Sequence, residues 1–129
     1  ITIPEARMLV FQPWDVTVLK AAEKAIQKSD IGINPNNDGK TLKLIFPPLT
    51  EERRIALTKQ VKKYGEEAKT AVRNIRRDAM EYFKNLKKKN EITEDEQKDA
   101  EKEIQNITDK QIAQIDKVIA GKEKELMEI

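Results

Sequence analysis

The segment AVRNIRRDAM, residues 71–80, contains three arginines within a span of five residues. A guanidinium is planar and always charged, and it can donate two parallel hydrogen bonds to a phosphate or a carboxylate. Arg73, Arg76 and Arg77 are therefore candidates for binding a polyanion. The alternative is a hydrated helix surface, because a run of charged residues is often only the side of a helix that faces water.

The spacing of neighbouring residues predicts that the arginines share one side of a long helix. At about 100° per residue, other basic residues fall within about 60° of Arg73. With the arginines they form the basic stripe: Lys62, Lys69, Lys84, Lys87 and Lys88. The apolar residues predict a packed face on the opposite side: Leu57, Val61, Tyr64, Ala68, Ala71, Val72, Ile75, Ala79, Tyr82 and Leu86. Acidic residues are nearly absent from the middle of the basic stripe, so we favour a polyanion-binding surface over a merely hydrated one.

Charge is unevenly distributed along the chain. The formal net charge is only +2, but residues 50–92 carry 13 basic and 7 acidic side chains, whereas residues 93–129 carry 6 and 11. Opposite signs in adjacent segments predict a polyanionic partner for the basic segment and a partner within the chain for the acidic one.

The composition excludes several classes of function. The sequence has no cysteine and no histidine, so zinc sites, imidazole bases and thiol nucleophiles lack their usual residues. We therefore expect no metal, no cofactor and no enzymatic activity. No apolar run is long enough to cross a bilayer, and the first residues do not resemble a secretory signal. These features predict a cytoplasmic protein without a membrane partner.

Two long helices must position the arginines. Thr50 can cap a helix that runs to about residue 90, and Thr93 with Glu96 forms a capping-box pattern that begins a second helix to about residue 127. The short link between them predicts an antiparallel pair. The apolar stripe of the second helix consists of Ile104, Ile107, Ile115, Val118, Ile119 and Leu126.

Residues 1–47 predict a small β/α domain. Residues 7–12 and 41–46 are typical of strands, and between them Asp15 can cap a helix with apolar residues at helical spacing. Trp14 is predicted to be a packing anchor at the end of the first strand. Two strands are marginal in water, so this domain is expected to need more sheet.

A short proline segment separates this domain from a helical domain over residues 48–129. Pro47 and Pro48 cannot donate backbone hydrogen bonds, and Thr50 already belongs to the next helix. The segment Pro47, Pro48, Leu49 and Thr50 is therefore a candidate hinge, and the expected fold class is α+β with two lobes.

Several strings resemble the bacterial ribosome recycling factor family. They are IPEARMLVFQPWD, AIQKSDIGINPNNDGKTLKL, PPLTEERR, AVRNIRRDA, EITEDE and KEKELMEI, and they follow the family's order along the whole chain. The combination of PPLTEERR with RNIRRDA is close to a family signature.

The resemblance implies an L-shaped, tRNA-like molecule in which a three-helix bundle is hinged to a small β/α domain. It implies a role after termination, when the factor acts with elongation factor G and GTP to split the ribosomal subunits. Arg76, flanked by Arg73 and Arg77, would contact large-subunit ribosomal RNA. Lys69 and Lys62 of the same stripe are included among the expected contacts.

The family also has a first long helix and opening strands before the point where this sequence begins. The resemblance therefore implies a fold that is incomplete at the amino end, with an apolar surface that a second copy could cover. From the residues alone, a function of another class is open as well. It is an antiparallel helical scaffold whose basic stripe binds an acidic protein.

Overall fold

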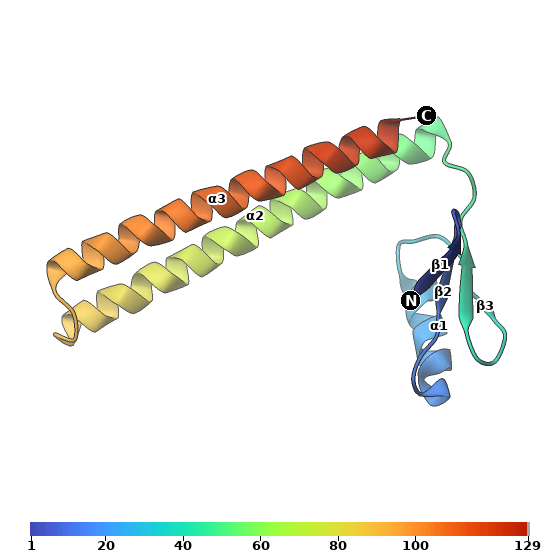
Figure 1. Ribbon diagram of the computed structural model, residues 1–129, viewed down its shortest axis with the longest axis horizontal. Helices are drawn as coiled ribbons and strands as arrows, with labels where there is room; N and C mark the ends of the chain where they lie inside the picture. Colours follow the sequence, from blue (N-terminus) through green and yellow to red (C-terminus); the bar gives the residue numbers. More distant parts are fainter. Residues whose placement is uncertain (129) are drawn as a thin grey trace. The chain divides into compact units, whose positions relative to one another are not determined.

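The computed structural model describes residues 1–128, and the chain forms two compact units, Ile1–Leu49 and a second that begins at Thr50. The fold is mostly helical with a small antiparallel sheet (Figure 1), so the predicted α+β class is confirmed. The division falls after Leu49, whereas the expected boundary was residue 47. The hinge stays a prediction.

A four-stranded antiparallel sheet in the order β1-β2-β4-β3 forms the first unit. Its strands are β1 (Thr2–Glu5), β2 (Met8–Phe11), β3 (Asn36–Asn37) and β4 (Leu42–Ile45). The predicted strands correspond to β2 and β4, in which Met8 pairs with Ile45 and Phe11 with Leu42. The expected count of two strands is wrong, because β1 and β3 extend both edges. Proline in β1 and asparagine in β3 are poor strand formers, and edge positions tolerate them.

The core of this unit is small, and its buried residues are three leucines and Pro35. Asp15 caps the short 3-10 helix η1 (Val16–Val18) by accepting from Thr17 N at 2.9 Å, and α1 (Leu19–Lys28) follows directly. Leu19 of α1 and Leu42 and Leu44 of β4 are buried.

Trp14 is fully exposed, so its predicted role as a packing anchor is wrong. The sheet ends at Phe11, and Trp14 lies in the turn before η1, where Pro13 is the half-buried residue. The leucines of α1 and β4 fill the core instead.

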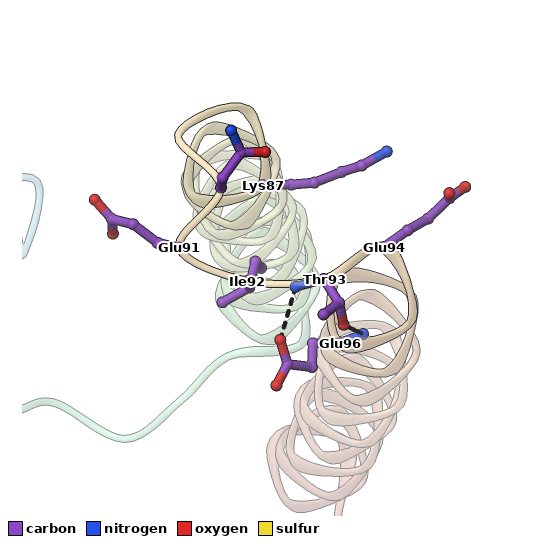
Figure 2. A pocket seen from close by; sticks show the side chains of 7 residues that line it. Lys87, Glu91, Ile92, Thr93, Glu94 and Glu96 are labelled. Carbon is purple, nitrogen blue, oxygen red and sulfur yellow. Dashed lines mark hydrogen bonds between the residues drawn. The ribbon is translucent and has the colours of Figure 1, made fainter.

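Two long antiparallel helices, α2 (Glu51–Lys88) and α3 (Glu94–Met127), form the second unit (Figure 1). Thr50 caps α2 as predicted, since its Oγ1 accepts from Arg53 N at 3.1 Å. The predicted capping box is also present (Figure 2): Thr93 N donates to Glu96 Oε2 at 2.7 Å, and Glu96 N donates to Thr93 Oγ1 at 3.1 Å. Asn90, with φ 57°, turns the chain between the helices.

The packed face of α2 differs from the predicted one. Buried and half-buried residues recur at steps of three and four: Arg54, Thr58, Val61, Gly65, Lys69, Val72, Arg76, Ala79, Phe83 and Leu86. This seam is rotated around α2 by roughly a sixth of a turn from the predicted centre. Tyr64, Ile75 and Tyr82 were expected in the core but are 56%, 67% and 61% exposed. Two helices bury only the surface between them, so an apolar arc wider than one seam stays partly exposed.

The predicted apolar stripe of α3 is also only partly buried. Leu126 is buried and Ile104, Ile115 and Ile119 are half-buried, whereas Ile107 and Val118 are more than half exposed. In an antiparallel pair, the angular positions of these residues put both exposed sets on the same side of the seam. We name this surface the apolar side: Tyr64, Ile75, Tyr82, Ile107 and Val118.

Candidate nucleic-acid interface

The predicted binding residues lie on the other side of the helix pair. Steps of three, four and seven along α2 bring Lys62, Lys69, Arg73, Arg76 and Arg77 to this side. The prediction that the basic stripe lies opposite the packed face is wrong for three of them. Lys62, Lys69 and Arg76 lie at the margin of the seam, where each contacts a side chain of α3.

Both lysines are paired with carboxylates. Lys69 Nζ lies 2.7 Å from Glu66 Oε1 and 3.0 Å from Asp116 Oδ1, and its side chain is only 14% exposed. The hydrogen bond to Glu66, followed by the one to Asp116, raises the pKa of Lys69 above its ordinary value. Lys62 Nζ lies 3.9 Å from Glu123 Oε1. The charges of these lysines are therefore compensated within the chain, as the opposite net charges of the two helical segments predicted.

The three arginines have no carboxylate partner in residues 1–128. Arg76 Nη1 donates to the carboxamide of Gln105 at 3.2 Å, and Arg77 Nη2 donates to the carboxamide of Asn74. The side chain of Arg73 is exposed and makes no hydrogen bond or ion pair within the described chain. A carboxamide is neutral, so the positive charge of all three guanidinium groups is uncompensated.

This arrangement suits the binding of phosphate groups. The guanidinium groups project from neighbouring turns of one helix, and each keeps N–H donors that can bind an anion bidentately. The structure thus distinguishes the three arginines, which retain their charge, from Lys62 and Lys69, whose charges are paired with carboxylates of the chain.

Sequence reasoning missed the residues of α3 that border this site. Gln105, Asp116 and Glu123 contact Arg76, Lys69 and Lys62. Facing residues of an antiparallel helix pair have numbers with a nearly constant sum, so the register could have been tested by matching the acids of α3 with the lysines of α2. The sequence did not specify which register was correct.

An open hollow of about 370 Å³ lies at the turn between α2 and α3 (Figure 2). Its lining includes Lys87, Glu91, Glu94 and Glu96, and the carboxylate of Glu96 belongs to the helix cap. Of the basic stripe it includes Lys87 but none of the arginines. Within residues 1–128, no cluster of acidic side chains is arranged to hold a metal ion, and no helix has the length and apolar character needed to cross a membrane.

Comparison with known proteins gives consistent matches along the chain. A family model described as ribosome recycling factor matches residues 1–127. The ribosome-recycling factor of Acetivibrio thermocellus is 65% identical over 129 residues, which cover 100% of this chain and 70% of that protein. The corresponding protein of Bacillus licheniformis is 54% identical with the same coverage.

Solved structures agree with these matches. A solution structure of the ribosome recycling factor has a TM-score of 0.60 and 41% identity, covering 99% of this chain and 67% of the other. A second describes the T. thermophilus ribosome recycling factor and the E. coli elongation factor G bound to the E. coli post-termination complex. It has a TM-score of 0.53 and 50% identity, covering 98% and 69% of the two chains. The chain therefore belongs to the ribosome recycling factor family.

Proposed function

We propose that this chain binds the post-termination ribosome and promotes the separation of its subunits together with elongation factor G and GTP. Membership of the ribosome recycling factor family supports this role, as does the similar factor solved with elongation factor G on a post-termination complex. The role belongs to the cytoplasm and requires no membrane. GTP hydrolysis is assigned to the elongation factor, and this chain acts without being an enzyme.

Within this role, Arg73, Arg76 and Arg77 bind large-subunit ribosomal RNA. The observation that supports this assignment is the absence of a carboxylate partner for any of the three in residues 1–128. Phosphates supply the missing negative charge. Lys69 and Lys62 contribute less, because Glu66, Asp116 and Glu123 already compensate them.

The hinge of the proposed factor is the segment from Pro47 to Thr50. Its two prolines lack an amide donor, and Thr50 is the N-cap of α2, so neither β4 nor α2 continues through the segment. Replacing both prolines by alanine is expected to reduce subunit separation more than ribosome binding.

Binding to purified large ribosomal subunits across a series of salt concentrations tests the RNA contact. Each lost phosphate contact lowers the slope of log affinity against log salt by about 1, so Arg76→Ala is expected to weaken binding and reduce the slope by that amount. The triple alanine variant of Arg73, Arg76 and Arg77 is expected to reduce it further. Lys110→Ala is the control, since this exposed lysine of α3 is not in the basic stripe.

Unaltered binding by the triple variant would refute the RNA contact. If the triple variant bound large subunits normally but lost binding to an acidic protein, the helical scaffold function would be favoured.

We also infer that the apolar side mediates self-association of this chain. Five large apolar residues are each at least half exposed on one side of the helix pair, and such patches commonly mark interfaces. Sedimentation is expected to show a concentration-dependent dimer that Ile75→Lys disrupts. A monomer at every concentration would contradict this inference.

A further inference from the structure

The carboxamide of Gln105 connects Arg76 of α2 with Asp109 of α3. Arg76 Nη1 donates to Gln105 Oε1 at 3.2 Å, and Gln105 Nε2 donates to Asp109 Oδ1 at 2.9 Å. Arg76 and Gln105 are both half-buried at the margin of the seam. In residues 1–128, Gln105 is the one side chain that accepts from Arg76.

Asp109 determines which end of the carboxamide faces Arg76. An ionised carboxylate can only accept hydrogen bonds, so it selects the NH₂ group of Gln105. The carbonyl oxygen is then turned toward the guanidinium. Asp109 follows Gln105 by four residues on α3, a spacing at which glutamine and aspartate side chains meet on a helix surface. The orientation of Gln105 is therefore set within α3, before any ligand is present.

A neutral acceptor has a different effect on Arg76 from that of an acid. The two carboxylates beside Lys69 restrain that lysine and also cancel its charge. Gln105 restrains one N–H of Arg76 and leaves its charge and its other donors available to an anion. A side chain that is already restrained loses less conformational entropy when it binds.

We propose that Gln105 and Asp109 are positioning residues that hold the guanidinium of Arg76 in place for a phosphate group of ribosomal RNA. The proposal rests on the proposed function of Arg76. It assigns part of the binding site to α3, although neither α3 residue needs to contact the RNA.

The test measures binding to purified large ribosomal subunits over a series of salt concentrations. Gln105→Met keeps the length of the side chain but removes both hydrogen bonds, so affinity is expected to fall about 3- to 10-fold, the cost of ordering one free side chain. The salt slope is expected to stay unchanged, because the charge of Arg76 remains. Asp109→Ala is expected to act in the same direction with a smaller effect.

Gln105→Glu separates positioning from charge. A carboxylate at position 105 keeps a partner for Arg76 but compensates its charge, so affinity is expected to fall and the salt slope to decrease by about 1. Helix content and thermal unfolding report whether each variant keeps the fold. Gln114→Ala is the matched control, because this glutamine of α3 is exposed and its helical position lies away from the side that carries Gln105.

A double-mutant cycle decides whether Gln105 acts through Arg76. In the Arg76→Ala background, Gln105→Met is expected to have no further effect on affinity. An additive effect would overturn the proposal, as would normal binding by Gln105→Met when Arg76→Ala binds weakly. Normal binding by Arg76→Ala itself would instead refute the proposed RNA contact, and with it this inference.

Discussion

Gly65 is buried in α2 where the helix faces Ile119 of α3. A Cβ atom at position 65 would lie 2.8 Å from Cγ1 of Ile119 and closer still to its Cδ1. The substitution Gly65→Ala therefore sets two opposing effects against each other. Alanine favours the helix, and its methyl group overfills the seam.

The magnitudes favour destabilisation. Replacing glycine by alanine inside a helix stabilises it by about 1 kcal/mol. Overfilling a packed interface costs typically about 1–3 kcal/mol. Cδ1 can rotate away, but Cγ1 is bonded directly to Cβ of Ile119, so the helices must separate slightly or the isoleucine must leave its preferred rotamer. We expect a net loss of about 1 kcal/mol in the free energy of unfolding, the difference between a cost of about 2 and a gain of about 1.

Urea unfolding followed by circular dichroism measures this change, and α3 supplies a matched control. A Cβ atom at Gly121 would have no heavy atom within 4 Å, so Gly121→Ala is expected to stabilise the protein by about 1 kcal/mol. In an Ile119→Ala background the obstruction is removed, and Gly65→Ala is expected to become stabilising as well.

The reasoning is refuted if Gly65→Ala stabilises the wild-type chain as much as Gly121→Ala does. It is also refuted if the effect of Gly65→Ala is the same with isoleucine and with alanine at position 119, because the clash would then not be its cause.

Three further predictions concern helix ends and a turn. Arg54 Nη1 donates to the carbonyl oxygens of Leu126 and Glu128, each at 2.6 Å. Arg54→Ala should therefore lower the free energy of unfolding in urea by about 2 kcal/mol and speed amide hydrogen exchange in the last turn of α3. Unchanged exchange would contradict this prediction. Thr93→Ala should cost about 1 kcal/mol by loss of the cap, whereas Thr93→Ser should cost less. Hydrogen bonds lower the pKa of Asp38 to about 2, and the bond from the Thr41 hydroxyl has a larger effect than those from the Lys40 and Thr41 amides. Because the pKa is lower in the folded protein, this carboxylate stabilises the fold at pH values above its ordinary pKa of 3.8, and the stabilisation is lost as the pH falls toward 2. The NMR signal of the Thr41 amide should follow that titration, and Asp38→Asn should abolish the dependence.

Features that depend on nearby residues were predictable. Thr50 and Thr93 cap their helices with bonds to amides three residues away, so the starts of α2 and α3 follow from local chemistry. Leu42 and Leu44 alternate with exposed residues, and this spacing identified β4 and its buried face. The edge strands β1 and β3 were not predicted, because their residues have low strand propensity and pairing with a neighbouring strand stabilises them.

Features that depend on a distant partner were not predictable. The apolar arc of α2 is wide enough to be buried from more than one direction, and the position of α3 exposes Tyr64, Ile75 and Tyr82. Trp14 is exposed for a related reason, because the leucines of α1 and β4 fill the small core.

The sequence by itself determined that the arginines and lysines of α2 share one broad surface, because helical spacing is a local property. Only the tertiary structure decided which of those charges are available. Asp116 lies 47 residues from Lys69 and compensates it, whereas Gln105 meets Arg76 and leaves its charge intact. The difference arises from the register and rotation of α3 against α2, which the whole seam sets and no single segment specifies.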